Sequence, residues 1–204
     1  RTLQLSVAAD LRVGARVLDR LLSTRGRQLS ESLRVLALDF AFREAVASGD
    51  RPTITSVLEN HGSRISADLV VLVDLNGSVI ADTLDGRMTA RPFPFPVLLR
   101  TARSAGEASG TVAVGGRPYQ LVIVPVLAPR PIAWVCAGFE INQSVLQDVL
   151  RLTAVEVSLW SNGIGQSAQL VSTLPTDERN DLALRLRQLV ILAGATDSTV
   201  TLGS

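Results

Sequence analysis

The sequence predicts an α+β fold, in which a long N-terminal helix is followed by two tandem antiparallel sheets, the second of them incomplete. Three observations predict it. The first 48 residues lack proline and carry apolar residues at helical spacing, five β-prone runs follow around one short helical segment, and a second hairpin-like segment comes after a further helix. The 204 residues are 47% hydrophobic, enough to build a core and to exclude intrinsic disorder.

The N-terminal helix is predicted over residues 2–48 with a bend near Gly26. Its apolar residues recur every three or four positions: Leu3, Val7, Leu11, Leu18, Leu21, Leu22, Leu29, Leu33, Leu36 and Phe40. Such a helix would be about 70 Å long, so we expect part of it to project or to pair with a second copy of the chain in a homodimer. Residues 49–52 end it, and a second helix is expected from Pro52 or Thr53 to about Ala67.

The first sheet is predicted to begin with a hairpin around Asn76-Gly77, because an Asn-Gly pair between two β-prone runs is the strongest short-range hairpin signal. Proline-rich residues 91–96 interrupt regular structure before a short helix that ends near Gly106. We expect the strands at residues 69–73, 78–81, 110–114, 118–126 and 132–139, and a further helix at 141–152.

The remaining sequence repeats this plan. Residues 157–174 match 71–84, the helical segment 176–192 matches 96–103, and residues 197–204 match 109–116. Three matches in the same order predict a tandem duplication. The second copy stops where the first would begin its last two strands, which would leave an exposed sheet edge. The expected organisation is a stalk helix at 1–51, a complete sheet unit at 52–140, and a linker helix with a partial second unit at 141–204.

The residue inventory excludes several classes of function. The net charge of +1 gives no reason to expect a nucleic-acid partner. All 20 basic residues are arginine, and the chain has one His and one Cys, so it lacks a Schiff-base lysine, a Cys/His metal cluster and an internal disulfide. Cys136 lies in an apolar run and is expected to be buried. A hydrolase would have to unite His61 with a carboxylate and a serine or Cys136, so we expect neither enzymatic activity nor a cofactor.

The most apolar stretch, residues 121–141, contains three prolines and Arg130 in its middle. It is therefore expected to form two strands joined by a turn rather than a membrane span. The chain has no signal-peptide pattern and does not begin with methionine, which suggests a fragment of a longer protein.

A long helix and a shorter helix precede a hairpin that contains Asp74, Gly77, Ala81, Asp82 and Thr83. This arrangement resembles the Cache superfamily of extracytoplasmic sensor domains, most closely the double Cache modules. The resemblance implies PAS-like sheets in the periplasmic part of an inner-membrane receptor, attached to the membrane by flanking segments. It also implies a cytoplasmic output domain, which could be a GGDEF/EAL enzyme of cyclic di-GMP metabolism, a histidine kinase or a chemotaxis transducer. The Tyr, Arg and Trp constellations of amino-acid-binding Cache domains do not occur here.

In a PAS-like unit, the inner face of the sheet and the insertion after the second strand, here residues 83–106, wall the pocket. The resemblance therefore suggests seven ligand-binding residues: Arg87, Arg91, Phe93, Phe95, Arg117, Tyr119 and Trp134. Arginine binds carboxylates in a bidentate manner and aromatic rings cover apolar ligand bodies, so a small organic acid is one expected ligand. The alternative interpretation is that these arginines are solvated and these aromatic residues form core.

Other candidate sites have simpler interpretations. Asp74, Asp82 and Asp85 could bind calcium, but turn caps explain them as well. His61 could sense pH or bind a ligand, although a bend at the end of the second helix accounts for it. Asn162 to Gly165 contains a G-x-G pattern that a hairpin turn explains better than a phosphate loop.

Two functions are compatible with these features. The first is a sensory domain that binds a small ligand and signals through helices to a cytoplasmic output domain. The alternative is a ligandless dimerisation or protein-interaction module in the same kind of receptor, with its pocket filled by its own side chains.

Overall fold

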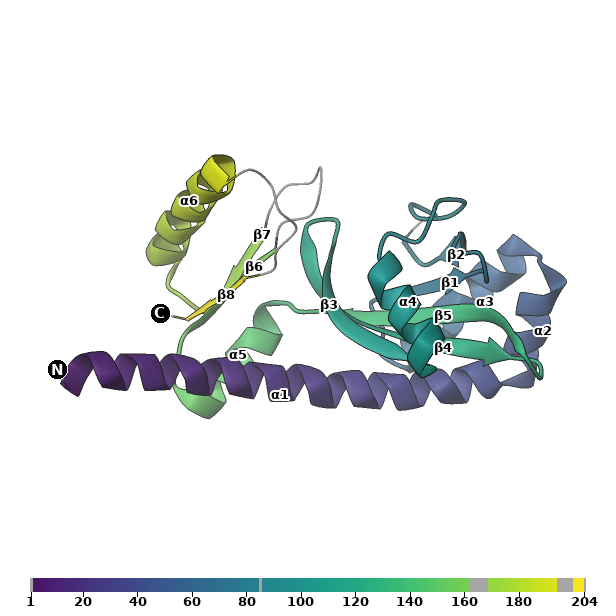
Figure 1. Cartoon of the computed structure of the whole chain (residues 1–204), viewed down its shortest axis with the longest axis horizontal. Coiled ribbons are helices and arrows are strands. Elements are labelled where there is room, and N and C mark those ends of the chain that lie inside the picture. Colours follow the sequence, from purple (N-terminus) through teal and green to yellow (C-terminus); the bar gives the residue numbers. More distant parts are fainter. Residues whose placement is uncertain (1, 85, 162–168, 194–199, 204) are drawn as a thin grey trace. The chain divides into compact units, whose positions relative to one another are not determined.

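A computed structural model describes residues 2–84, 86–161, 169–193 and 200–203. The chain divides into two compact units, which are described separately. The major unit comprises Thr24–Gly110 and Gln120–Phe139, and the minor unit comprises Arg1–Ser23, Thr111–Tyr119 and Glu140–Ser204. The predicted α+β class with two antiparallel sheets is confirmed (Figure 1).

Helix α1 (Thr2–Leu38) is continuous through Gly26, and the predicted bend lies instead at Asp39. Asp39 adopts an extended conformation and its carboxylate accepts a hydrogen bond of 2.8 Å from Phe42 N, so it caps a new helix, α2 (Phe40–Ser48). This local cap ends α1 ten residues before the predicted terminus at Ser48.

Helix α3 (Arg51–Arg64) begins one residue before the predicted Pro52, with Asp50 as its N-cap and the proline in its first turn. It contacts strands β1 (Leu69–Val73) and β2 (Val79–Asp82) of the larger sheet. The approach is close because Gly62 faces Val70: a Cβ at position 62 would lie 2.9 Å from Val70 Cγ2. The helix ends before the predicted Ala67, since Ser66 takes a positive φ of 54°.

The larger sheet has the strand order β2-β1-β5-β4-β3 (Figure 1). Its strands are β1 (Leu69–Val73), β2 (Val79–Asp82), β3 (Ala108–Val114), β4 (Arg117–Leu127) and β5 (Pro131–Glu140), with α4 (Pro96–Ala105) between β2 and β3. Every residue of β1 is buried. In the antiparallel ladders, Val71 lies opposite Asp82 on one side and opposite Cys136 on the other.

The minor unit contains α5 (Gln143–Thr153), β6 (Val157–Ser161), β7 (Gln169–Ser172), α6 (Thr176–Ala193) and β8 (Val200–Gly203). Its sheet has the order β7-β6-β8. The sequence match aligned β8 with β3, but β8 pairs with β6, which is the position that β5 takes beside β1. This pairing covers the edge of β6 that β7 leaves open.

The two hairpins share a detail that supports the predicted repeat. Thr83 donates its backbone N–H to Val70 O at 3.0 Å, and its hydroxyl accepts from Val70 N at 2.9 Å. Thr173 makes the same pair of hydrogen bonds with Val157, at 2.9 and 2.8 Å. We call this two-way contact the threonine latch. The sequence alignment placed Val71 opposite Val157, one residue away from the latch partner Val70.

Residues 121–141 lie mainly in β4 and β5, as predicted, and the turn between the strands is closed by a hydrogen bond of 2.8 Å from Ala128 N to Arg130 O. Within the described part of the chain, no helix has the length and apolar character that crossing a membrane requires.

Candidate functional site

Asp82 is a buried carboxylate at the end of β2, with 1% of its surface exposed. It accepts hydrogen bonds from Leu84 N at 2.9 Å, Met88 N at 3.0 Å and Thr89 Oγ1 at 2.8 Å. Directly opposed residues of an antiparallel ladder project to the same face, so Asp82 shares a face of the sheet with Val71. These three bonds satisfy the buried charge and fix the first half of the insertion that follows β2.

The second half of the insertion runs along β2. Val79 N donates to Arg91 O at 2.8 Å, Ala90 N donates to Val79 O at 2.9 Å, and Phe93 N donates to Gly77 O at 2.8 Å. The backbone of residues 90–93 is therefore held against the edge strand of the sheet.

Five of the seven predicted ligand residues belong to the major unit. Phe93 and Trp134 are buried, and the rings of Phe93 and Phe95 meet edge to face with centroids 5.5 Å apart. The structure thus brings the two phenylalanines together at the end of the insertion. Arg87 and Arg91 have exposed side chains.

The other two predicted residues, Arg117 and Tyr119, belong to the minor unit and meet at one carboxylate. Arg117 Nη1 lies 3.3 Å from Glu140 Oε2, and Tyr119 donates its hydroxyl to the same oxygen at 3.4 Å. Arg117 therefore already has an anionic partner, which competes with any incoming carboxylate.

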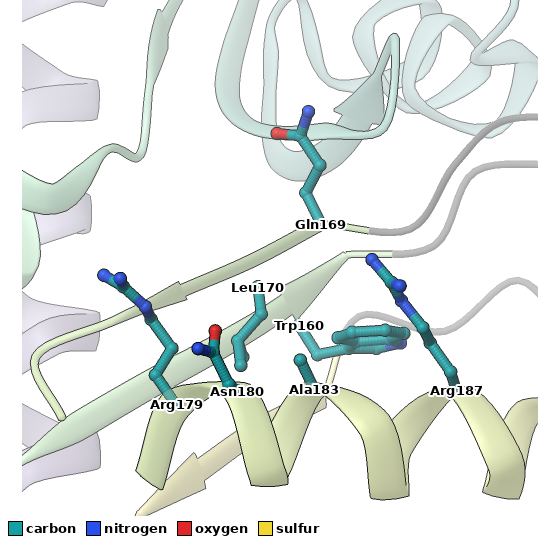
Figure 2. Close-up of a pocket in the computed structure, with 7 residues that line it drawn as sticks. All are labelled: Trp160, Gln169, Leu170, Arg179, Asn180, Ala183 and Arg187. Carbon is teal, nitrogen blue, oxygen red and sulfur yellow. The ribbon is translucent and has the colours of Figure 1, made fainter. Parts of the chain in front are cut away.

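The minor unit also contains a pocket of about 260 Å³ between α6 and the β6-β7 hairpin (Figure 2). Its lining residues are Trp160, Gln169, Leu170, Arg179, Asn180, Ala183 and Arg187. The sequence reasoning missed this pocket. The available signal was the spacing of Arg179, Ala183 and Arg187, which places two arginines and a small residue along one side of a helix.

The remaining candidates make local contacts where they are described. His61 lies within α3 rather than at a bend, with its ring 6.2 Å from that of Phe42. Asp74 caps the hairpin turn by accepting from Ser78 N at 2.8 Å. Burial raises the pKa of the Cys136 thiol, which makes it unreactive. Asp85 and residues 162–165 lie outside the described residues. Among the residues described, no group of three or more His, Cys, Asp or Glu could hold a metal ion.

Comparison with known proteins identifies similar sensory domains. The family model dCache_3, described as a double sensory domain of two-component sensor kinase, matches residues 4–182. Curated protein sequences give no significant match.

Three solved structures share the fold. The V. cholerae histidine kinase DctB sensor domain is 15% identical with a TM-score of 0.59, over 89% of this chain and 76% of that one. The periplasmic domain of Vibrio cholerae LuxQ is 14% identical with a TM-score of 0.55, over 80% and 78%. The E. coli DcuS sensor domain is 17% identical with a TM-score of 0.54, over 64% of this chain and 98% of that one.

Proposed function

Because the chain belongs to the dCache_3 family of double sensory domains, we propose that it binds a small ligand outside the cytoplasm and signals through its helices to the output domain of a membrane receptor. The family is sensory rather than catalytic. The output domain is proposed to be a histidine kinase, a chemotaxis transducer, or a diguanylate cyclase or phosphodiesterase.

The buried Asp82 carries the proposal for the ligand site. Its three hydrogen bonds hold the insertion after β2 in a defined shape beside the sheet. A binding loop on a rigid scaffold is preorganised, which lowers the entropic cost of ligand binding. The Asp82 carboxylate itself is fully engaged, so other groups must contact the ligand.

We propose that those groups are the predicted residues of the insertion and the adjacent strand. Phe93, Phe95 and Trp134 would supply an apolar wall, and the exposed Arg87 and Arg91 would close over a ligand carboxylate. Long exposed arginines can reorient without disturbing the sheet. A small organic acid is the ligand class that suits these side chains.

A thermal-shift screen against organic acids, amines and nucleobases tests this site. A ligand present at about 100 times its Kd would stabilise the protein by about 2.7 kcal/mol. The increase in Tm should saturate with concentration and should disappear in Arg91→Ala. The control Arg100→Ala removes an exposed arginine from α4 and should retain the response. A response that survives in both Arg87→Ala and Arg91→Ala would place the site elsewhere.

One observation favours the alternative of a ligandless interaction module. Phe93 and Trp134 are only 4% and 6% exposed, so they already fill part of the space where a ligand would lie. Absence of any saturable shift across the screen, with binding of a protein partner to the major unit, would support this second function.

We further propose that the chain forms a homodimer through its N-terminal helical region. Val35, Leu38 and Phe40 are 71%, 63% and 67% exposed at the junction of α1 and α2. Three large apolar side chains close together in sequence and open to water are typical of a contact surface. Light scattering should give the mass of a dimer for the wild type and of a monomer for Leu38→Asp. A monomeric wild type would exclude this dimer.

A further inference from the structure

We propose that the pocket of the minor unit is a second binding site, specific for a small organic carboxylate, in which Trp160, Arg179 and Arg187 provide the recognition. This site is separate from the one proposed in the major unit. All seven lining residues come from β6, β7 and α6 within the minor unit.

The first observation is a buried donor without an acceptor. Trp160 is 4% exposed, and its indole Nε1 is buried with no hydrogen-bond partner among the described residues. Buried indole N–H groups normally find an acceptor, because an unsatisfied donor is costly. Figure 2 shows the indole ring at one end of the pocket, beside the Arg187 side chain that extends from α6. An acceptor oxygen that enters there would satisfy this N–H.

The second observation concerns charge. Arg179, Ala183 and Arg187 are four residues apart along α6, so they lie on one side of the helix. Neither arginine forms an ion pair with a described carboxylate, whereas Arg185, on the same helix, pairs with Asp181 at 2.8 Å. The pocket therefore has two uncompensated positive charges and an uncharged donor, and no carboxylate lines it.

The third observation concerns the part of the pocket between Arg179 and Arg187, namely its volume and the residues that line it. Leu170 and Ala183 lie in the middle of the pocket, the Asn180 amide lies beside Arg179, and the Gln169 side chain points away from α6 (Figure 2). A volume of about 260 Å³ is just below the usual range for ligand pockets, so only a small molecule would fit. Apolar groups in the middle favour an anion with a small carbon body over an inorganic one. A carboxylate can accept from Trp160 Nε1 and from the Arg187 guanidinium together.

Fluorescence of single-tryptophan variants can test the site. The chain has two tryptophans, so Trp134→Phe leaves Trp160 as the sole indole and Trp160→Phe leaves Trp134. We would titrate both variants of the 204-residue chain with acetate, pyruvate, succinate, benzoate and inorganic phosphate at millimolar concentrations. At least one carboxylate should shift the Trp160 emission saturably and leave the Trp134 emission unchanged. No shift of Trp160 with any carboxylate, or a shift with phosphate alone, would overturn the proposal.

Calorimetric titration of the unmodified chain and its variants provides the second measurement, which does not depend on how well Trp134→Phe folds. Arg187→Gln and Arg179→Gln should each weaken carboxylate binding about tenfold. Trp160→Phe should also weaken it, because phenylalanine keeps an aromatic ring but lacks the indole N–H. Arg185→Gln is the matched control, because it removes a charge from the same helix outside the pocket, and it should bind like the wild type. If Arg185→Gln weakened carboxylate binding equally, the loss of affinity would follow from net charge alone, which would contradict the proposed site.

The two binding proposals can fail independently. An organic acid that bound at both sites would still stabilise Arg91→Ala, so the thermal screen is repeated in the Arg187→Gln background. There, loss of the response on adding Arg91→Ala reports on the major unit alone, and the Trp160 signal reports on the minor unit alone. A Trp160 response that persists in Arg91→Ala would support the second site whatever the outcome for the first.

Discussion

The hydroxyl of Thr89 donates a hydrogen bond of 2.8 Å to the carboxylate of Asp82, which lies seven residues earlier in the chain. Met88 N donates to the same carboxylate oxygen, and Leu84 N donates to the other. The insertion after β2 therefore closes on a single buried charge, and its conformation depends on that charge.

Asp82→Asn should lower the free energy of unfolding by about 2 kcal/mol, because an amide cannot accept on both sides as a carboxylate does, and its NH₂ would face a donor. Urea denaturation measures the loss. Asp74→Asn is the matched control, since the asparagine oxygen can still accept from Ser78 N at the hairpin turn, and it should be close to neutral. Equal effects of the two substitutions would show that the charge of Asp82 is not required.

Gly138→Ala should destabilise the major unit by about 1–3 kcal/mol, because the new methyl group would overpack the core. Its Cβ would lie 2.3 Å from Leu121 Cδ2 and 3.1 Å from Gln120 O. Denaturant midpoints report the change. Gly26→Ala serves as the control. Gly26 lies inside α1, where alanine favours the helix, and the new Cβ would lie 3.4 Å from Gln120 Nε2. That substitution should be neutral or slightly stabilising, and a loss as large as that of Gly138→Ala would contradict the packing described.

Cys136 should resist thiol reagents in the folded protein, since it is fully buried and burial raises the pKa of its thiol. It is the single cysteine of the chain, so labelling with Ellman's reagent follows the opening of the β1-β5 region directly. Labelling should be complete in denaturant and should accelerate in Gly138→Ala. Rapid labelling of the native wild type would show that this part of the sheet opens readily.

Asp50 should make the stability of α3 depend on pH in the acidic range. Hydrogen bonds from the hydroxyl and the backbone N–H of Thr53 lower the pKa of the Asp50 carboxyl below its ordinary value of 3.8. A lowered folded-state pKa means that the stabilisation is present above the unfolded-state value and is lost as the pH falls through the folded-state pKa. The Tm of the wild type should therefore exceed that of Asp50→Ala at neutral pH.

This Tm difference should shrink at pH values below 3.8. Asp50→Asn is the control, because its amide oxygen can still cap the helix but does not titrate. A difference between Asp50→Ala and the wild type that stays constant through the acidic range would show that the charge has no role.

Local signals in the sequence account for most of the fold. The predicted hairpin forms at Asn76-Gly77, with a loop of residues 75–77: Gly77 takes a φ of 97° and donates its N–H to Asp74 O at 3.1 Å, and Asp74 N donates to Ser78 O at 2.8 Å. The end of α1 could not be predicted in the same way, because Asp39 interrupts an apolar pattern that continues to Phe42. A cap of one residue leaves the helical period intact, so periodicity does not reveal it.

The candidate sites depend on contacts that a linear sequence does not display. Trp160 lies on β6, whereas Arg179 and Arg187 lie on α6, and they share a pocket only after the helix packs on the hairpin. Arg117 illustrates the opposite difficulty. An arginine side chain is suited to binding an anionic ligand, but in the folded chain Arg117 forms an ion pair with Glu140.

The threonine latch marks matching positions in the two hairpins, so the residue before each threonine can be compared. In the major unit it is Asp82, and in the minor unit it is Ser172, whose hydroxyl accepts from Leu174 N at 3.1 Å as Asp82 accepts from Leu84 N. Asp82 serves two further donors of its insertion, and Ser172 instead contacts the hydroxyl of Ser158 at 2.6 Å. The two hairpins thus share the latch and the local hydrogen bond that follows it, and they differ in using a carboxylate in one and a hydroxyl in the other. The carboxylate stands before the long insertion that it holds in place, and the hydroxyl stands where α6 follows β7 after a short connection.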